Sequence, residues 1–243
     1  MYSFPPLAAA IGVLYSVVTN LTTLLTPVLG GPSAAAAIVL MTMVIRLLLL
    51  PVARAQVRAE HHRTKLAPEI STLSRKYQHN PERLRRELAA LYSRAGTSPL
   101  AGCLPALVQA PAFMVLYGLF LTSEVSGQAN VLLTHALAGV PLGAQLADVW
   151  GTAELLVFVV LLLLLAAVAW FTRRQAINVS TAAAATPMQA RTTALLRLLP
   201  FGTVHIAAIV PLAAGLYLLT STSWTVAERS ILRRRLGRRD TPG

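Results

Sequence analysis

Residues 33–52 have the sequence SAAAAIVLMTMVIRLLLLPV, in which Arg46 is the only charged side chain. About twenty mainly apolar residues are what an α-helix needs to cross the hydrocarbon core of a bilayer. The whole chain of 243 residues agrees, because 55% of it is hydrophobic and only 12% is charged. Soluble domains carry about 25% charged residues, since their surface must be solvated. The composition therefore predicts an integral membrane protein and excludes soluble enzymes and disordered tails.

Three further apolar stretches are long enough to cross a membrane, and they cover residues 102–122, 153–171 and 195–226. The last is too long for one ordinary span. Pro211 near its middle predicts two short helices, because proline removes a backbone donor and breaks a helix. We therefore expect an all-α polytopic membrane protein with five transmembrane helices, the first in residues 31–53 and the other four in residues 102–228.

The distribution of charge predicts how these spans are oriented. The formal net charge is +12, and most of the 21 Lys and Arg residues lie in residues 54–94, 173–197 and 229–239. Residues 123–152 contain no Lys or Arg. Because cytoplasmic loops carry an excess of cations, we expect the N-terminus outside, with residues 54–94 and a basic tail at residues 229–243 in the cytoplasm. Such a tail can bind anionic lipid or the phosphates of ribosomal RNA.

Residues 1–30 carry an apolar stripe with helical spacing, made of Leu7, Ile11, Leu14, Val18, Leu21, Leu25 and Val28. Uncharged polar residues lie mostly on the opposite side, namely Ser16, Thr19, Asn20, Thr23 and Thr26. This division favours an amphipathic helix that lies in the outer headgroup layer. A sixth span is the alternative, because no cation precedes Arg46 to set the orientation of this segment.

Residues 54–101 predict a cytoplasmic helical hairpin rather than a plain linker. Two apolar stripes follow each other, the first made of Leu66, Ile70, Leu73 and Tyr77 and the second of Leu84, Leu88, Leu91 and Tyr92. Between them, Asn80-Pro81-Glu82 is typical of a helix start, with Asn as N-cap, Pro in the first turn and Glu at the positive end of the helix dipole. We expect Pro68 to kink the first helix.

Arg46 is the candidate functional residue. It lies six residues before Val52, about 9 Å along a helix axis, and a charge at such a depth costs at least about 2–3 kcal/mol on insertion scales. Such residues usually face a hydrated interior, whereas a snorkelling side chain that reaches the inner headgroups is the alternative. The spans contain no well-buried carboxylate to pair with Arg46, and Glu228 is expected near the inner surface. We therefore expect a wet, electropositive pocket open to the cytoplasm, for which candidate lining residues are Gln109, Tyr117, Thr203, His205, Tyr217, Thr220 and Ser221.

Several short motifs resemble one known family. They are Pro68-Glu69, Tyr77, Leu91-Tyr92, Ser98-Pro99 and the run GCLPALVQAPAFMVLY at residues 102–117. Together with the late arginine of the first span, these residues resemble the YidC/Oxa/Alb family of membrane protein insertases, over roughly residues 15–232. The sequence departs from the family pattern at Ser98, Leu218, Thr222 and Glu228, where Asn, Trp, Asn and Gln are common.

This resemblance implies an insertase of the bacterial cytoplasmic membrane that receives nascent membrane proteins in a cytoplasm-open hydrophilic groove and releases their helices into lipid. By position, Arg46 takes the role of the groove charge. Gln109 and Tyr117 fall on the second span, and Pro200, Pro211, Tyr217, Thr220 and Ser221 fall on the last two. The hairpin and the basic tail are expected to contact the ribosome or targeting machinery, and the Sec translocon and anionic lipid are further candidate partners.

The main alternative is a small channel or transporter in which Arg46 binds an anionic solute, although the internal repeats common in transporters are not found. A scaffold that anchors another molecule to the membrane is a third option. No phosphate-binding loop follows either lysine. Cys103 is the only cysteine, and Glu60-His61-His62 lacks the spacing of a zinc site. We therefore expect no enzyme activity, no cofactor and no metal.

Overall fold

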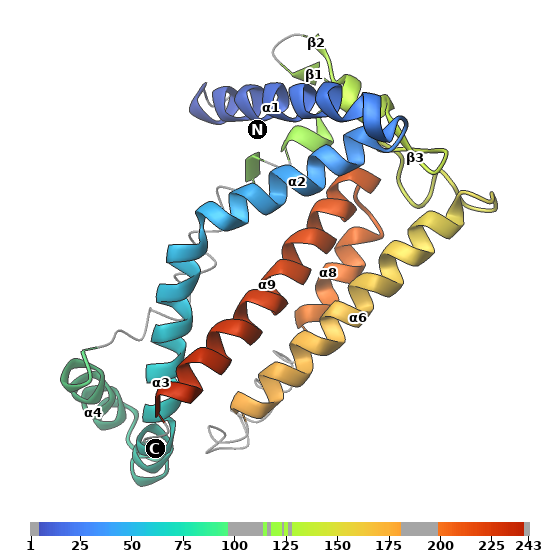
Figure 1. The fold of residues 1–243 in the computed structure, drawn as a ribbon. Helices are drawn as coiled ribbons and strands as arrows, with labels where there is room; N and C mark the ends of the chain where they lie inside the picture. The colour runs from blue at the N-terminus through green and yellow to red at the C-terminus, as the bar shows by residue number, and fades with distance from the viewer. Residues whose placement is uncertain are drawn as a thin grey trace.

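The computed structural model describes residues 5–96, 114–115, 118–122, 124–125, 128–180 and 199–240 (Figure 1). These residues are mainly helical, and the long helices are α1 (Pro5–Leu29), α2 (Ser33–Leu48), α3 (Leu50–Lys76), α4 (Pro81–Arg94), α6 (Leu155–Ser180), α8 (Leu199–Ala207) and α9 (Leu212–Asp240). Two small antiparallel pairs lie between α4 and α6: β1 (Glu124–Val125) with β2 (Gln128–Ala129), and β3 (Ala136–Leu137) with β4 (Val140–Pro141). The short 3-10 helix η2 (Val131–Thr134) separates them.

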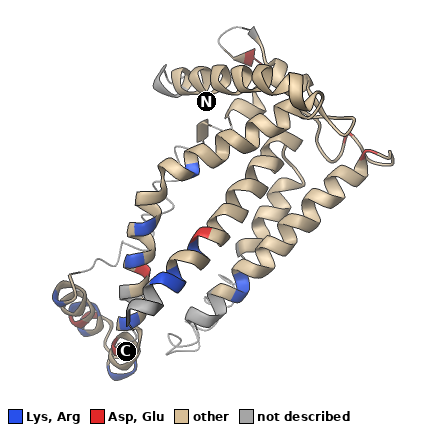
Figure 2. Ribbon diagram, in the orientation of Figure 1, with Lys and Arg blue, Asp and Glu red and all other residues tan. Residues whose placement is uncertain are grey.

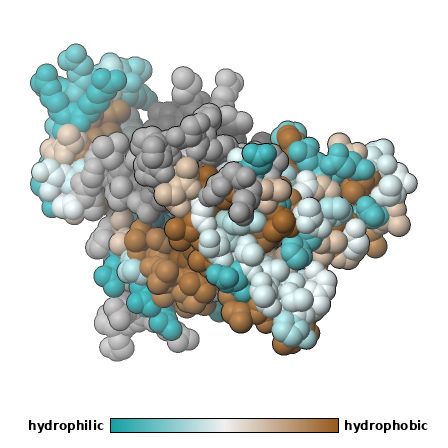
Figure 3. All heavy atoms as spheres, turned by 90° about the horizontal axis from the view of Figure 1, so that it is seen from above, coloured by the Kyte–Doolittle hydropathy of each residue, from teal (hydrophilic) through white to brown (hydrophobic). Residues whose placement is uncertain are grey.

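Helix α1 lies across one end of the bundle, transverse to the long helices (Figure 1). Most of the described part of the expected apolar stripe packs against the protein core, because Ile11 and Val18 are buried and Leu14, Leu21 and Leu25 pack on the core, whereas Val28 is 81% exposed. The outward face is mixed, since Val13 and Leu24 are exposed beside polar residues. Seen from this end, a hydrophobic area lies beside hydrophilic and neutral residues (Figure 3). The stripe therefore docks α1 on the bundle rather than facing away from it.

Within the first predicted span, helix α2 ends at Leu48 and the chain continues at once into α3. Helix α2 and helix α3 meet at Leu49 with a bend of 58°. Pro51 in the first turn of α3 explains the bend, because its nitrogen cannot donate to the carbonyl of residue 47 and its ring clashes there. Arg46 consequently lies in the last turn of α2, directly before the bend.

Beyond the bend, α3 continues to Lys76 and a short turn leads into α4. The predicted helix start is confirmed: the Asn80 side chain accepts a hydrogen bond from the Arg83 backbone N–H at 3.1 Å, and Pro81 and Glu82 occupy the first turn. The residues of both apolar stripes are buried or half-buried, with Leu91 the most buried. Pro68 lies inside α3, which is one continuous helix there.

Helix α9 is the central helix of the fold and packs against α2, α3, α6 and α8. The predicted break at Pro211 is present, because α8 ends at Ala207 and α9 begins at Leu212. The first N–H groups of α9 bond to the segment between β4 and α6: Leu212 donates to the carbonyl of Ala144 and Ala213 to that of Leu142, both at 2.9 Å. These bonds fix that segment against the start of α9.

The predicted basic tail at residues 229–243 begins as a continuation of α9, which runs without a break from Leu212 to Asp240; its cytoplasmic location stays a prediction. A continuous helix forms since the sequence after Val226 contains good helix formers and no proline before Pro242. Lys and Arg residues gather along α3, α4 and the far parts of α6 and α9, away from α1, whereas the charged residues drawn at the α1 end are acidic (Figure 2). The two ends of the molecule thus differ in positive charge.

By length and composition, two described helical segments can cross a membrane, Ala8–Leu29 and Leu155–Gln175, and the bent pair of α2 and α3 is a third. Most of the predicted span at residues 102–122 lies outside the described residues. Helix α8 has nine residues and is shorter than an ordinary span. The described part of the chain is thus that of an α-helical membrane protein.

Candidate functional site

The Arg46 side chain points from α2 to α9, where its Nη2 donates a hydrogen bond to Oγ of Ser221. Arg46 is half-buried and Ser221 is buried. A snorkelling arginine would instead extend along the helix toward the headgroups. The guanidinium is therefore held between two helices of the bundle.

Small side chains allow α2 and α9 to approach each other. The buried residues of α2 include Ala34, Ala35 and Ala37, and those of α9 include Ala213 and Ala214. Small residues are typical of helix contacts inside membranes, because they let two backbones come close. This packing brings the end of α2, and with it Arg46, against the middle of α9.

Tyr217 and Glu228 lie close enough to interact electrostatically with Arg46. Tyr217 precedes Ser221 by one helical turn and is buried, and Glu228 follows it by about two turns on the same side. Glu228 is only 9% exposed and is therefore buried in the protein, while its expected position near the inner membrane surface stays a prediction. It lies on α9, which packs against α2 and α3.

Two buried polar atoms of α9 have no hydrogen-bond partner among the described residues, Nε1 of Trp224 and Oε1 of Glu228. Buried polar atoms are normally satisfied by protein or by ordered water. Arg46 has five N–H donors, of which Ser221 takes one among the described residues. Arg46 and Glu228 therefore have hydrogen-bonding capacity left for further partners.

The other predicted site residues divide into three groups. Tyr217 and Ser221 lie beside Arg46. Thr220 is their neighbour on α9, and its hydroxyl donates to the carbonyl of Leu216 at 2.9 Å. Thr203 and His205 lie on α8, where His205 is exposed and Thr203 lines a different cavity. Gln109 and Tyr117 lie outside the described residues.

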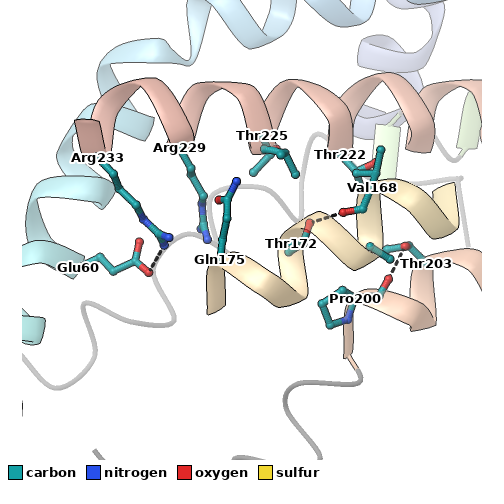
Figure 4. A pocket seen from close by; sticks show the side chains of 12 residues that line it. Glu60, Val168, Thr172, Gln175, Pro200, Thr203, Thr222, Thr225, Arg229 and Arg233 are labelled. Atoms are coloured by element: carbon teal, nitrogen blue, oxygen red, sulfur yellow. Dashed lines mark hydrogen bonds and ion pairs between the residues drawn. The ribbon is translucent and has the colours of Figure 1, made fainter. Parts of the chain in front are cut away.

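This second cavity lies between α6, α8 and α9 and has a volume of about 280 Å³ (Figure 4). Its lining consists of Glu60, Val168, Ala169, Thr172, Gln175, Pro200, Thr203, Thr222, Thr225, Val226, Arg229 and Arg233. At one end Arg233 forms an ion pair with Glu60 at 2.8 Å, which joins α9 to α3. Gln175 donates to Oγ of Ser230 at 2.8 Å and joins α6 to α9.

The threonine hydroxyls of this cavity all donate to carbonyls of their own helices. Thr172 donates to Val168 and Thr203 to Pro200, and Thr222 and Thr225 do the same on α9. Such hydroxyls present only lone pairs to the cavity. Sequence reasoning missed most of these residues, although Thr222, Val226, Arg229 and Arg233 repeat at helical spacing along one face of α9.

The described residues contain no group of three or more His, Cys, Asp or Glu side chains that could hold a metal ion. Cationic side chains instead dominate both polar regions. Arg46 lies in one, and Arg229 and Arg233 line the other. The described arrangement defines a polytopic helical membrane protein with an arginine held inside its helical bundle.

Comparison with known proteins places this class more narrowly. The family model described as "60Kd inner membrane protein" matches residues 24–239. The chain therefore belongs to this family, which is the YidC/Oxa/Alb family of the resemblance.

Three relatives illustrate the breadth of the family. The chain is 40% identical to the membrane protein insertase YidC of Clostridium perfringens over 83 residues, which are 34% of this chain and 35% of the relative. It is 28% identical to the YidC insertase of Streptomyces avermitilis over 211 residues, 79% of this chain and 49% of the relative. It is 36% identical to the chloroplastic inner membrane protein PPF-1 of Pisum sativum over 106 residues, 43% and 23% respectively. The chain thus spans half or less of the length of these relatives.

Proposed function

We propose that this protein is a membrane protein insertase that receives the translocated segment of a nascent membrane protein beside Arg46 and releases its helices into lipid. The observation that carries the proposal is the guanidinium of Arg46, which is held between α2 and α9 by the neutral hydroxyl of Ser221. A neutral partner leaves the positive charge and most of the donors available to a substrate. Membership of a family whose relatives are named insertases supports the same activity.

The physical basis is a lower cost of carrying polar groups into the membrane. A carboxylate that leaves water must find hydrogen-bond donors, because an unpaired charge in an apolar medium costs several kcal/mol. The guanidinium offers a bidentate fork to such a carboxylate. The bond stabilises the segment only while its helix remains beside the groove, and the gain from burying apolar side chains in lipid then draws that helix away.

The proposed topology places the α1 end outside and the charged end in the cytoplasm. It has five spans, with α1 in the outer interface, the hairpin of α3 and α4 in the cytoplasm, and a cytoplasmic C-terminus. The separation of charge along the molecule supports this orientation (Figure 2). The transverse course of α1 supports the interfacial assignment (Figure 1). The bacterial cytoplasmic membrane is the proposed location.

The proposed partners follow from the same distribution of charge. Cationic side chains on α3, α4 and the far part of α9 suit the phosphates of a ribosome or of anionic lipid. Targeting machinery and the Sec translocon are further proposed partners.

The test is insertion of a single-span substrate with an acidic translocated segment into proteoliposomes that contain the purified protein. A charge-assisted hydrogen bond contributes about 1.5–3 kcal/mol, so Arg46→Ala should lower the insertion rate roughly 10- to 100-fold. Arg46→Lys should retain most activity, because it keeps a charge at the same depth. A matched substrate with Asn and Gln in place of the acids should respond much less to Arg46→Ala.

The same liposomes distinguish the alternative function. Flux of small anions without insertion of protein would favour a channel or transporter. Insertion of the acidic substrate at the wild-type rate by Arg46→Ala would show that this arginine has no role in receiving substrate.

A further inference from the structure

Glu228 is a buried carboxyl group near the cation of the proposed groove. Its side chain is 9% exposed, and its Oε1 has no hydrogen-bond partner among the described residues. Burial opposes the charged form of this carboxyl, and among the described residues three cations favour it, Arg46 on α2, Arg229 on α9 and Arg54 on α3. A carboxyl group with a free acceptor in such surroundings is unlike a closed structural ion pair, in which both partners are satisfied.

The position of Glu228 relates it to Arg46 rather than to the surface. Arg46 bonds to Ser221, and Glu228 lies seven residues further along the same helix, about 10 Å along its axis. Because seven residues are close to two helical turns, the side chains of Ser221 and Glu228 face the same side of α9. A substrate carboxylate that approaches Arg46 must therefore enter the field of Glu228 as well.

We propose that Glu228 is the specificity-determining counter-charge of the groove: it offsets part of the attraction of Arg46, and so sets how strongly acidic translocated segments are preferred over neutral and basic ones. This inference rests on the proposed insertase function. The negative charge of Glu228 offsets part of the positive charge of Arg46, so an acidic substrate segment is attracted only by the part that is not offset. Substrates with several acids gain more than those with one, and basic segments are tolerated.

The size of the effect follows from Coulomb's law. The charges are those of Glu228 and of a substrate carboxylate bound at Arg46, and their separation is taken as the axial spacing of about 10 Å between Ser221 and Glu228. At an effective dielectric constant of about 20 to 40, two unit charges at this distance change a rate or affinity roughly 4- to 15-fold. Partial hydration and salt reduce the interaction. We therefore expect a change of about threefold to tenfold in charge preference when the charge of Glu228 is removed.

The experiment compares three substrates that differ only in the translocated segment, which carries two Asp, two Asn or two Lys residues. Insertion rates into proteoliposomes give the acidic-to-neutral and basic-to-neutral ratios. Glu228→Gln keeps the shape of the side chain and should raise the first ratio about threefold to tenfold while lowering the second. Glu228→Asp keeps the charge and should retain the wild-type ratios.

The matched control is Glu82→Gln, which removes the same charge from the exposed first turn of α4. It should leave both ratios within about twofold of wild type. An equal shift in Glu82→Gln would mean that net charge alone sets the preference, and would overturn the inference. Unchanged ratios in Glu228→Gln, beside a lost acidic preference in Arg46→Ala, would overturn the role of Glu228 and leave the proposed function intact. Unchanged ratios in Arg46→Ala would overturn both.

Discussion

Replacing Arg46 by Leu should make the protein more stable and less active. Arg46 occupies the last turn of α2, where Val44 and Ile45 precede it and four leucines follow it in sequence. Leucine continues that apolar surface and matches the volume of the lost side chain approximately. If Arg46 serves substrate rather than the fold, its removal relieves a cost that the folded protein bears.

The expected size comes from insertion scales and from the contacts of Arg46. An arginine at the centre of a span is unfavourable by about 2.5–3.5 kcal/mol, whereas leucine is favourable by about 0.5 kcal/mol. Arg46 lies near the end of α2, so its cost is lower than at the centre, and the lost bond to Ser221 offsets part of the gain. Without Arg46 the Ser221 oxygen loses one donor, while its O–H can still donate to the carbonyl four residues earlier, as Thr222 and Thr225 do. We expect the free energy of unfolding to rise by about 1–3 kcal/mol.

The assay is reversible unfolding in lipid bicelles, followed by tryptophan fluorescence, for the wild type, Arg46→Leu and a matched control. Arg58→Leu serves as control, because Arg58 is exposed on α3 beyond the bend. Its change should stay within about 0.5 kcal/mol, as for most surface substitutions. Insertion of an acidic substrate, measured on the same preparations, should fall only for Arg46→Leu.

A loss of about 3–5 kcal/mol in Arg46→Leu would refute this reasoning. That size is typical of breaking a buried ion pair, in which the remaining partner is left charged and unsatisfied. It would mean that Arg46 and Glu228 form a closed structural pair. Arg46 would then hold the helices together instead of waiting for a substrate.

Three further predictions concern the packing that positions the site. A Cβ at Gly215 would lie 2.6 Å from Cδ2 of Leu161, so Gly215→Val should destabilise the contact of α6 with α9 by about 1–3 kcal/mol. Gly215→Ala should cost less, because the leucine side chain can rotate away. Unfolding in bicelles measures the free energy of both variants. Glu60 and Arg233 are about one third exposed, and a double-mutant cycle should give a coupling of only about 0.2–1 kcal/mol that falls in 1 M salt; a larger, salt-independent coupling would contradict the partial exposure. Asn80→Ala should weaken the start of α4 by about 1 kcal/mol, seen as faster hydrogen exchange in its first turn, and unchanged exchange would show that the cap contributes little.

Local sequence signals predicted the parts of the fold that depend on neighbouring residues. Asn80 and Pro81 begin α4 because a side-chain acceptor and a fixed φ act within one turn. Pro211 lies directly before α9 and separates it from α8, because its missing N–H and its ring disfavour a continuous helix, although Pro68 is accommodated inside α3. An arginine deep in an apolar run has few favourable positions, and the bond of Arg46 to Ser221 agrees with the expected inward orientation, whereas the hydrated pocket around it stays a prediction.

Features that depend on tertiary contacts were not predictable in this way. The apolar stripe of α1 is equally suitable for lipid and for protein, and only packing shows that Ile11 and Val18 contact the core. The sequence places Glu228 near the end of the last predicted span but does not show that the protein buries its side chain. The cavity beside Thr172 and Arg229 joins three helices that are distant in sequence. Gln109 and Tyr117, which the resemblance places in the groove, remain predictions.

The unbroken course of α9 has a mechanical consequence. Ser221 and Arg233 are twelve positions apart on one helix, about 18 Å at 1.5 Å per residue. Because the helix is unbroken between them, a molecule that binds Arg233 and the arginines beside it is held at a fixed distance and rotation angle relative to the guanidinium of Arg46. One alanine inserted between these positions would turn the far arginines by about 100°. The helix therefore fixes both the distance and the direction from Arg46 to a molecule bound at the far arginines of α9, so that molecule would approach Arg46 in one orientation.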